Sequence, residues 1–350
     1  MTPRLRATAL LLVAGLVACE SDATLPEPGE PGPTGELLLD ASSSTAFTYV
    51  DLENLSTVTP ATPATSTGWD VGIRRYEVRL NGGLTGPGDV AATVLVDHAG
   101  QDAATILGYT AANRLAEFEA IDADDIPAAA AFSASGFGND PSSWFTPTGQ
   151  GIAANPARAW KIRRGDGGFA VLRIAEFGFT GQALTGFTVE YRLQSGSALG
   201  SLESATIVPG APGAPTRLSL ATGTATTADG CGWDLAVDAA LTVTLNTGCN
   251  AGSYPLQSGE AFDALTTVDA PQYGPFLAAI TSPIANSVSA DDAPPFLYGL
   301  DEANPHRLVP SFNIYLVRRG TAVYNVQFLI YYNPAGGASG FPTLRVSRIK

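Results

Sequence analysis

Two histidines are the side chains of this 350-residue chain best suited to hold a metal or a metal-containing ligand. His98 is followed two residues later by Gly100, and His306 comes directly after Pro305. A neutral imidazole binds metals well, and its pKa also suits proton transfer near neutral pH. Glycine and proline are common in loops, so a solvated loop histidine is the more frequent interpretation of both settings. We retain His98 and His306 as candidate haem- or ligand-binding residues beside that alternative.

The sequence lacks the common motifs of catalysis. It contains no Gly-x-Ser-x-Gly element and no Gly-Lys-Ser/Thr loop, because neither Lys161 nor Lys350 follows a glycine. Two isolated histidines also argue against a Ser-His-Asp triad. Paired carboxylates stay open, since 33 acidic residues are available and their separations are unknown. We predict that the protein is not an enzyme, with a hydrolase as the remaining catalytic alternative.

The sequence predicts no metal site built from several acids or cysteines. Asp122, Asp124 and Asp125 form one acidic cluster, and Asp291 and Asp292 form another. Neither cluster has the glycine and the terminal glutamate of a twelve-residue calcium loop, so solvated turns are the simpler interpretation. The three cysteines form no Cys-x-x-Cys pair and no Cys/His cluster with zinc spacing.

Cys231 and Cys249 are candidates for a disulfide bond. If residues 233–247 fold back as a hairpin, the numbers of paired residues sum to about 480, which places the two cysteines opposite each other. If the stretch is one continuous strand at ~3.3 Å per residue, the cysteines lie far beyond the ~7 Å limit for bridged Cα atoms. An exported protein encounters an oxidising compartment, so we predict the bond, with free thiols as the alternative.

The elements that position these residues are indicated by an internal repeat. Residues 69–83 begin with Trp69-Asp70, and a second copy begins with Trp233-Asp234. Asn81 of the first copy corresponds to Asn246 of the second, and the second copy has one extra residue between its tryptophan and this asparagine. Duplication of a whole domain is the simplest explanation of the repeat. We interpret the shared residues as a signature of core and turn positions rather than as ligand contacts: Trp69, Asp70, Asn81, Trp233, Asp234 and Asn246.

The apolar pattern of both copies predicts strands. In the first copy the apolar residues change parity at Arg74-Arg75, which predicts a turn or bulge. In the second copy the extra residue falls between Asp238 and Ala240, where a turn can absorb it. The chain therefore turns within each signature.

Each copy closes on a hairpin and a further strand, at residues 159–193 and 314–349. A helix-compatible pattern occurs between residues 103 and 121, and residues 132–156 resemble a long loop with a hydrophobic plug at Trp144-Phe145. The predicted fold class is all-β with minor helix, as two tandem homologous β domains.

The N-terminus resembles a bacterial lipoprotein signal. Arg4 and Arg6 precede an apolar stretch that ends in Leu-Val-Ala-Cys, with Cys19 at the position that becomes acylated. The apolar stretch is too short to span ~30 Å of hydrocarbon as a helix. An ordinary secretory signal is the alternative. Residues 20–36 are rich in proline, and as an extended tether they would reach on the order of 50 Å.

The predicted organisation follows from these signals and from a Gly/Pro-rich stretch between the two copies. It consists of a signal peptide at residues 1–18, a Pro-rich tether at 19–36, a first β domain at 37–194, a linker at 195–215 and a second β domain at 216–350.

The charge of the chain is strongly negative. The formal net charge of −14 becomes −16 when Arg4 and Arg6 are removed with the signal. A surface this acidic repels phosphate backbones, which argues against nucleic acid as a partner.

Four features of the first copy occur in a fixed order: the Trp-Asp stretch, the Leu-Asn-Gly-Gly that follows it, a closing Trp-Lys-Ile-Arg hairpin and a Gly-Phe-Thr-Val-Glu-Tyr strand. In this combination the chain resembles the HmuY-like lipoproteins. The resemblance covers roughly residues 46–194 and, more loosely, 216–350. It implies an all-β fold, anchoring through a lipidated cysteine, for which Cys19 is the match, and capture of haem at the cell surface.

The haem ligands of that family do not transfer directly to this chain. In its well-known haem binders, two histidines or two methionines of one domain hold the iron. Here Met1 is the only methionine, and each copy has one histidine, His98 or His306. Three alternatives remain: a histidine with a tyrosine, a site shared between copies or chains, or no haem.

The sequence therefore predicts a lipoprotein of the cell envelope that binds a small-molecule ligand without catalysis, with haem as the candidate. Its lipid anchor is expected in the outer membrane, on the periplasmic or the surface face. The alternative is a structural or interaction module at the cell surface that binds a protein or glycan partner. The ligand pocket is expected in the divergent middle of a copy, at residues 84–157 or 250–310.

Overall fold

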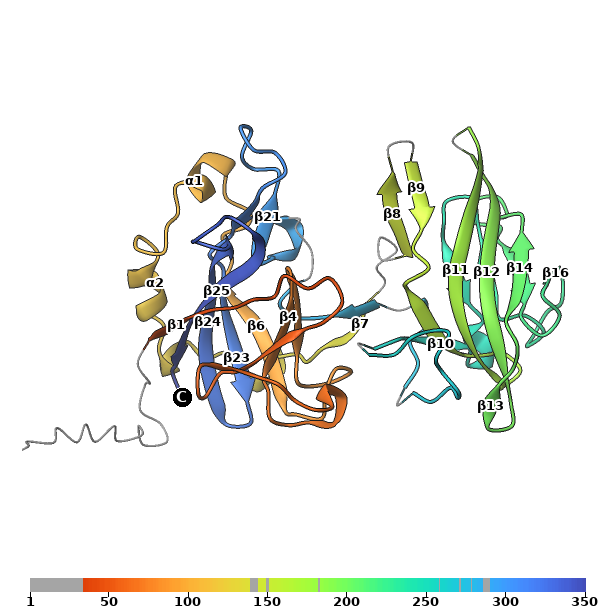
Figure 1. Ribbon diagram of the computed structural model, residues 1–350, viewed down its shortest axis with the longest axis horizontal. Coiled ribbons are helices and arrows are strands. Elements are labelled where there is room, and N and C mark those ends of the chain that lie inside the picture. The colour runs from red at the N-terminus through yellow and green to blue at the C-terminus, as the bar shows by residue number, and fades with distance from the viewer. Residues whose placement is uncertain are drawn as a thin grey trace, which may run out of the picture.

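The computed structural model describes residues 34–138, 144–148, 151–181, 183–257, 259–270, 272–277, 279–285 and 290–350. Cys19, the predicted signal peptide and most of the predicted tether lie outside these residues. The described chain forms two lobes of antiparallel β-sheet that lie side by side, with a few short helices (Figure 1). None of its helices is long and apolar enough to cross a membrane.

Lobe 1 combines the two ends of the chain, residues 34–138 and 279–350. Its larger sheet contains, in spatial order, β1 (Gly35–Leu38), β25 (Ser339–Arg348), β24 (Ala322–Tyr332), β23 (Ile314–Arg319) and β6 (Val90–Val96). Its second sheet contains β3 (Ser56–Val58), β2 (Thr48–Asp51), β4 (Val71–Arg74) and β5 (Glu77–Leu80). A small pair at its rim is formed by β21 (Phe296–Tyr298) and β22 (Leu308–Pro310).

Lobe 2 is formed by residues 144–277. Its larger sheet contains β13 (Ala198–Leu199), β12 (Ala183–Ser195), β11 (Phe169–Thr180), β10 (Ala159–Arg163) and β19 (Gly252–Pro255), and β14 (Glu203–Ile207) also pairs with β12. Its second sheet contains β16 (Thr224–Thr226), β15 (Thr216–Ser219), β17 (Leu235–Val237) and β18 (Val243–Leu245). A separate hairpin is formed by β8 (Phe145–Thr148) and β9 (Gly151–Ala154).

The two lobes have the same strand order. The path β1-β25-β24-β23-β6 corresponds to β14-β12-β11-β10-β19, and β3-β2-β4-β5 corresponds to β16-β15-β17-β18. Each sequence copy is divided between the lobes, because the first signature packs with the closing strands near the C-terminus and the second signature with the closing strands near the middle. The predicted boundaries at 37–194 and 216–350 therefore do not match the two cores.

The predicted linker and tether also need correction where they are described. Residues 203–207 of the expected linker 195–215 pair with Phe187 to Tyr191 of β12, so this segment is part of a sheet. The end of the expected tether pairs too, since Glu36 lies opposite Arg345. A composition rich in glycine and proline marked the turns around these short strands but not the strands themselves.

Chain reversal within each signature is confirmed. Arg75 has φ of +56° between β4 and β5, the left-handed backbone that a tight turn requires. In the second copy Leu235 lies opposite Leu245 and Val237 opposite Val243, so the paired numbers sum to 480 as predicted. This hairpin brings Cys231 and Cys249 into the predicted disulfide, with their Cα atoms 5.4 Å apart.

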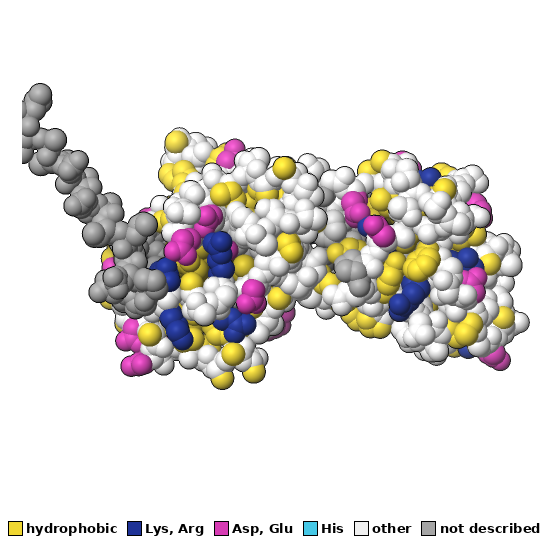
Figure 2. Space-filling view, turned by 90° about the horizontal axis from the view of Figure 1, so that it is seen from below, with side chains coloured by type: hydrophobic (Ala, Val, Ile, Leu, Met, Phe, Trp, Pro, Cys, Tyr) yellow, Lys and Arg dark blue, Asp and Glu magenta, His cyan; other side chains and the backbone are white. Residues whose placement is uncertain are grey.

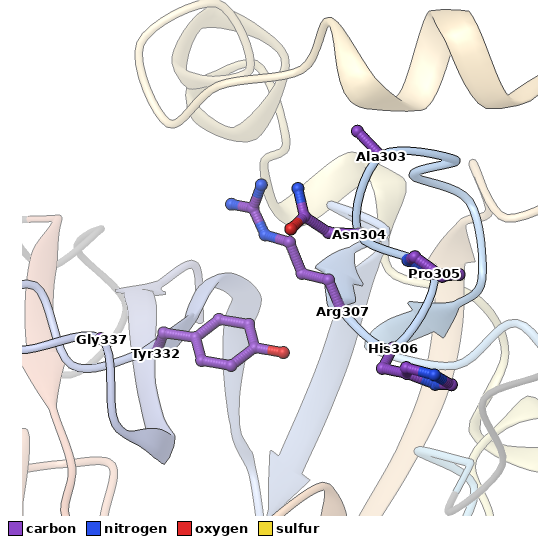
Figure 3. Close-up of a pocket in the computed structure, with 7 residues that line it drawn as sticks. All are labelled: Ala303, Asn304, Pro305, His306, Arg307, Tyr332 and Gly337. Atoms are coloured by element: carbon purple, nitrogen blue, oxygen red, sulfur yellow. The ribbon is translucent and has the colours of Figure 1, made fainter.

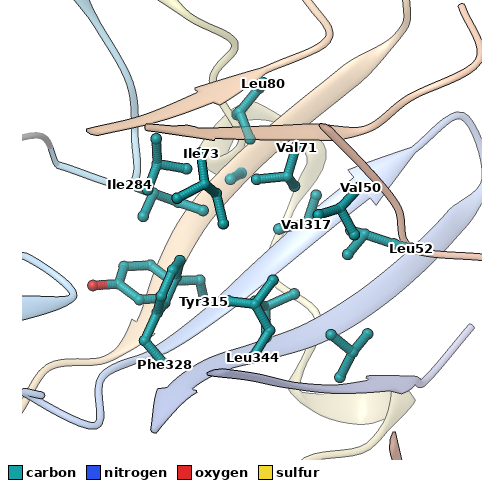
Figure 4. Packing of buried hydrophobic residues seen from close by; sticks show 14 of the residues in the cluster. Val50, Leu52, Val71, Ile73, Leu80, Ile284, Tyr315, Val317, Phe328 and Leu344 are labelled. Atoms are coloured by element: carbon teal, nitrogen blue, oxygen red, sulfur yellow. The ribbon is translucent and has the colours of Figure 1, made fainter. Parts of the chain in front are cut away.

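The core of lobe 1 lies between its two sheets (Figure 4). Val71 and Ile73 of β4 face Tyr315 and Val317 of β23, and all four side chains are fully buried. Lobe 2 has its own core between equivalent sheets, which includes Leu235, Val237, Ile162, Leu172 and Val189. Two separate cores explain why the lobes are distinct packing units.

The helical region is shorter than predicted. Two helices, α1 (Ala103–Leu107) and α2 (Leu115–Glu119), replace the single pattern at residues 103–121, because Gly108 ends the first helix. Single-turn helices also occur at η1 (Pro63–Thr65), η2 (Ala123–Asp125), η3 (Ala129–Ala131), η5 (Thr247–Cys249) and η6 (Ala290–Asp292). Asp122 caps η2, in agreement with a turn role for that acidic cluster.

The lobes are joined by a narrow connection. The chain leaves lobe 1 through β7 (Gly136–Gly138) and returns through β20 (Ala279–Thr281), and these two strands pair with each other. The expected plug residue Trp144 is buried in lobe 2 against Trp160. At the junction, the Tyr254 hydroxyl donates to the carbonyl oxygen of Leu84 at 3.0 Å.

Candidate functional site

A pocket of about 570 Å³ lies at the rim of lobe 1, beside the β21–β22 hairpin. This volume falls within the range of small-molecule sites. The connecting loop of the hairpin supplies most of the lining, and the end of β24 with the turn that follows it supplies the rest (Figure 3). The lining residues are Ala303, Asn304, Pro305, His306, Arg307, Tyr332 and Gly337.

The loop that carries His306 is organised by a single carboxylate. Asp301 accepts hydrogen bonds from the backbone N–H of Ala303 at 3.0 Å and from the side-chain amide of Asn304 at 3.2 Å. The Asn304 side chain, together with the backbone N–H groups, lowers the pKa of Asp301 below its ordinary value. The loop is therefore shaped by an ionised aspartate at neutral pH.

His306 has one ring nitrogen engaged. Its Nδ1 lies 2.5 Å from the hydroxyl oxygen of Tyr298, which is the last residue of β21. Nε2 makes no hydrogen bond with any part of the chain that the structure describes. A histidine that binds a metal through one nitrogen is usually oriented by a hydrogen bond at the other, and His306 has this arrangement.

Two further side chains give the pocket its character. The ring of Tyr332 points toward the loop, while Arg307 and Asn304 extend into the space above it (Figure 3). Arg307 is 54% exposed and lies 3.7 Å from Asp301, so its guanidinium is accessible to an anionic group. The ring of His306 is turned away from Tyr332, so these two residues do not face each other as a pair of axial ligands.

His98 has a different environment. It is 7% exposed, its Nε2 lies 3.0 Å from Glu117, and its backbone N–H donates to Asn313. Its ring also packs edge-on against Tyr109. The side chain does not line the pocket, and these contacts would have to break before the ring could reach a ligand.

Both histidines nevertheless belong to lobe 1, although they come from different sequence copies. Leu297 packs in the cluster beneath the His98 loop, whereas Tyr298 contacts His306. Adjacent residues of a strand point to opposite faces, so the β21 strand lies between the two histidine environments. The fold therefore favours a site with one histidine over a bis-histidine site.

The signature residues form buried structural networks rather than a pocket. The Asp70 carboxylate accepts the backbone N–H of Leu52 at 2.8 Å, and the Asp234 carboxylate accepts that of Leu220 at the same distance. Asn81 donates its side-chain amide to the carbonyl of Trp69. Asn246 makes the equivalent bond to Trp233, which is less buried than Trp69.

Each signature aspartate pairs with an arginine of the other sequence copy. Asp70 lies 3.3 Å from Arg319, and Asp234 lies 3.6 Å from Arg164. These pairs link a signature hairpin to the closing strands that complete its lobe. They explain the burial of the aspartates without any ligand.

Sequence reasoning identified the His306 loop but missed Tyr298, Arg307 and Tyr332. Only Arg307 adjoins the histidine in sequence. The two tyrosines end strands of ordinary alternating pattern, and no feature of that pattern separates a rim residue from a core residue. Among the described residues, no group of three or more His, Cys, Asp and Glu side chains is arranged to hold a metal ion.

Comparison with known proteins points to one family. The model of the family described as HmuY protein matches residues 43–191, which is 149 of the 350 residues. The match begins before β2 and ends in β12, so it spans parts of both lobes and does not include the second signature. No curated protein matches the chain.

Three solved structures are similar over most of their length. The first is a candidate lipoprotein of Bacteroides fragilis NCTC 9343, with 13% identity, a TM-score of 0.31 and 89% of each chain covered. The second is a candidate HmuY-like haem-binding protein of Bacteroides vulgatus ATCC 8482, with 10% identity, a TM-score of 0.32 and coverage of 89% of this chain and 90% of that chain. The third is the apo HmuY analogue of Tannerella forsythia, with 9% identity, a TM-score of 0.33 and coverage of 92% of this chain and 98% of that chain. These scores are too low to support a statement about this chain.

HmuY-like haem-binding proteins bind a ligand and catalyse no reaction. This agrees with the prediction that the present chain is not an enzyme.

Proposed function

We propose that the protein captures a flat, anionic ligand, with haem as the candidate, at the pocket between the β21–β22 loop and Tyr332. The observation that carries this proposal is the geometry of His306, whose Nδ1 is held by Tyr298 while Nε2 is left available. The match of residues 43–191 to the HmuY family supports the choice of haem.

The chemistry of the pocket suits such a ligand. The Nε2 of His306 is a donor of the type that binds haem iron. Arg307 follows directly in sequence and is accessible, so it is placed to pair with a carboxylate at the edge of the same ligand. Tyr332 supplies an aromatic wall, fixed by the 2.9 Å hydrogen bond that its hydroxyl accepts from the Leu308 backbone N–H.

Titration with haem tests the proposal. At micromolar protein we expect a Soret shift, and the His306→Ala substitution should abolish it. Arg307→Gln should weaken the affinity for haem by about tenfold, because one charge-assisted bond is lost. His98→Ala is the matched control and should leave the spectrum of the bound haem unchanged, because that ring is buried against Glu117.

Two outcomes would contradict the proposal. The absence of any spectral shift would remove haem as the ligand and favour the protein or glycan partner. A shift lost in His98→Ala but retained in His306→Ala would move the site to the other histidine.

We further propose that the mature protein is anchored to a membrane through lipidated Cys19, in the cell envelope. The lipobox-like sequence that ends in Cys19 supports this. Metabolic labelling with a fatty acid should mark the wild type but not Cys19→Ala.

A further inference from the structure

One edge of the larger sheet of lobe 2 is open. Strand β14 pairs with β12 on one side, in a register without a bulge. On its other side, the backbone N–H and C=O groups of residues 203–207 make no hydrogen bond with any part of the chain that the structure describes. Figure 1 shows β14 on the side of lobe 2 that faces away from lobe 1. An open edge of this kind can pair with a strand of another chain.

The strand lacks the features that usually protect such an edge. Its five residues include no proline, lysine or arginine. The one charged side chain, Glu203, accepts a hydrogen bond from the Tyr191 hydroxyl at 3.1 Å. Strand β16 of the second sheet lies near β14 but forms no ladder with it, and Ser204 and Thr206 stay exposed. The edge is therefore accessible.

Two exposed apolar side chains flank this strand. Val208 is 70% exposed and Leu202 is 51% exposed, and no other large hydrophobic side chain in the described residues is as exposed as these two. Because Ile207 lies in the core of lobe 2, the alternation of the strand places Leu202, Ser204, Thr206 and Val208 together on the outer face. One exposed leucine is ordinary, but two such residues at the ends of one open strand indicate a contact surface.

The sequence of the strand is self-complementary in one antiparallel register. Opposite residues of a regular ladder direct their backbone groups toward each other, so two copies of one strand pair only where the residue numbers sum to an even number. With a sum of 410, all five residues of β14 are paired about Ala205. The same register places Leu202 opposite Val208 and Ser204 opposite Thr206. Sums of 408 and 412 leave one end of the strand unpaired and separate Leu202 from Val208.

We propose that two copies of this chain associate through β14, as an antiparallel strand pair that joins the larger sheets of their second lobes about a twofold axis. Each contact of such an interface occurs twice, so Leu202 and Val208 form one apolar pair at each end. The pocket at His306 belongs to lobe 1 and stays open in this arrangement, because β14 faces away from that lobe (Figure 1).

Pairing of one short strand gives a weak dimer. It buries less than the roughly 1,600 Å² of a standard interface, so we expect a Kd on the order of 10–100 μM. The net charge of −14 makes two copies repel each other. On the face shown in Figure 2, acidic and basic side chains are interspersed over both lobes, so no large field of one sign is concentrated there. Salt should therefore strengthen the dimer by screening the overall repulsion.

Sedimentation equilibrium of the mature chain with Cys19→Ala, at about 5 to 500 μM, tests the proposal. We expect a monomer–dimer equilibrium that becomes tighter with added NaCl. Leu202→Glu and Val208→Lys should each raise the Kd by about tenfold, because a charge then faces an apolar side chain. The chain with both substitutions should recover part of the affinity, because the glutamate of one copy then faces the lysine of the other.

Leu38→Glu is the matched control. Leu38 is 48% exposed and ends β1, the strand of lobe 1 that corresponds to β14, so this substitution makes the same change at the other edge. It should leave the Kd unchanged. Circular dichroism of each variant establishes that it is folded.

Three outcomes would overturn the proposal. A monomer at every concentration would leave the edge of β14 to a strand of another protein. A dimer that neither single substitution weakens would have its contact elsewhere. Failure of the doubly substituted chain to recover any affinity would exclude the pairing of Leu202 with Val208. Haem binding at His306 is measured separately and does not depend on these results.

Discussion

The environments of single residues separate the two histidines that the sequence offers as candidate ligands. Nε2 of His306 has no hydrogen-bond partner among the residues that the structure describes, and Tyr298 engages Nδ1, whereas His98 is buried against Glu117 and Tyr109. Burial and partners, which depend on the fold, thus decide which imidazole can serve a ligand.

Two carboxylates of the first signature should affect stability in opposite directions as pH changes. Burial raises the pKa of Asp70 above its ordinary 3.8, so its contribution to the free energy of unfolding falls as pH rises above about 4. Burial alone would raise the pKa of Glu77, but Arg79 and Arg74 lower it below 4.5, so its contribution is lost as pH falls below that value.

Urea denaturation between pH 3.5 and 6.5 measures this difference. The advantage of the wild type over Asp70→Asn should shrink as pH rises, and its advantage over Glu77→Gln should grow. Parallel pH dependences for the two variants would show that these pKa directions are wrong.

At the level of elements, the two signatures form the same hairpin with different reinforcement. The first hairpin turns tightly at Arg75 and is held by Glu77. The second has a longer turn, in which the Asp238 carboxylate accepts the backbone N–H groups of Ala240 and Thr242, and a disulfide closes its open end.

Loss of the disulfide should therefore destabilise lobe 2 selectively. Closing a loop of 18 residues reduces the entropy of the unfolded chain, and replacing both Cys231 and Cys249 with serine should cost about 3 kcal/mol. Hydrogen exchange can resolve the lobes: protection should fall in β17 and β18 and stay unchanged in β4 and β5. Equal loss in both lobes would mean that they unfold as one unit.

At the level of the whole molecule, the chain enters and leaves lobe 2 through the paired strands β7 and β20. Lobe 2 is thus a continuous segment with its own core, inserted into lobe 1, which is assembled from both ends of the chain.

This arrangement predicts which fragments fold. Residues 144–277 should give a cooperative β-sheet protein with an intact disulfide, because they contain both sheets of lobe 2. Residues 216–350, the domain expected from the repeat, should stay unfolded, because their signature lacks β10 to β12. Circular dichroism during thermal unfolding of the two fragments measures this difference. A cooperative transition in residues 216–350 and none in residues 144–277 would contradict the prediction.

The sequence by itself determined the local features: the β class, the closing hairpins at residues 159–193 and 314–349, the reversal at Arg74-Arg75 and the pairing of Cys231 with Cys249. These depend on alternation, turn residues and short separations, which neighbouring residues encode directly. The expected ligand region at residues 250–310 contains residues 303–307 of the pocket lining, whereas Tyr332 and Gly337 lie outside it.

Only the tertiary structure decided which closing strands complete which signature. Both copies present the same apolar faces and the same Asp and Arg partners, so either combination would bury the same kinds of side chain. The choice lies in contacts between residues far apart in the sequence, such as Asp70 with Arg319 and Asp234 with Arg164. Because those contacts set the lobes, they also set the position of the His306 pocket.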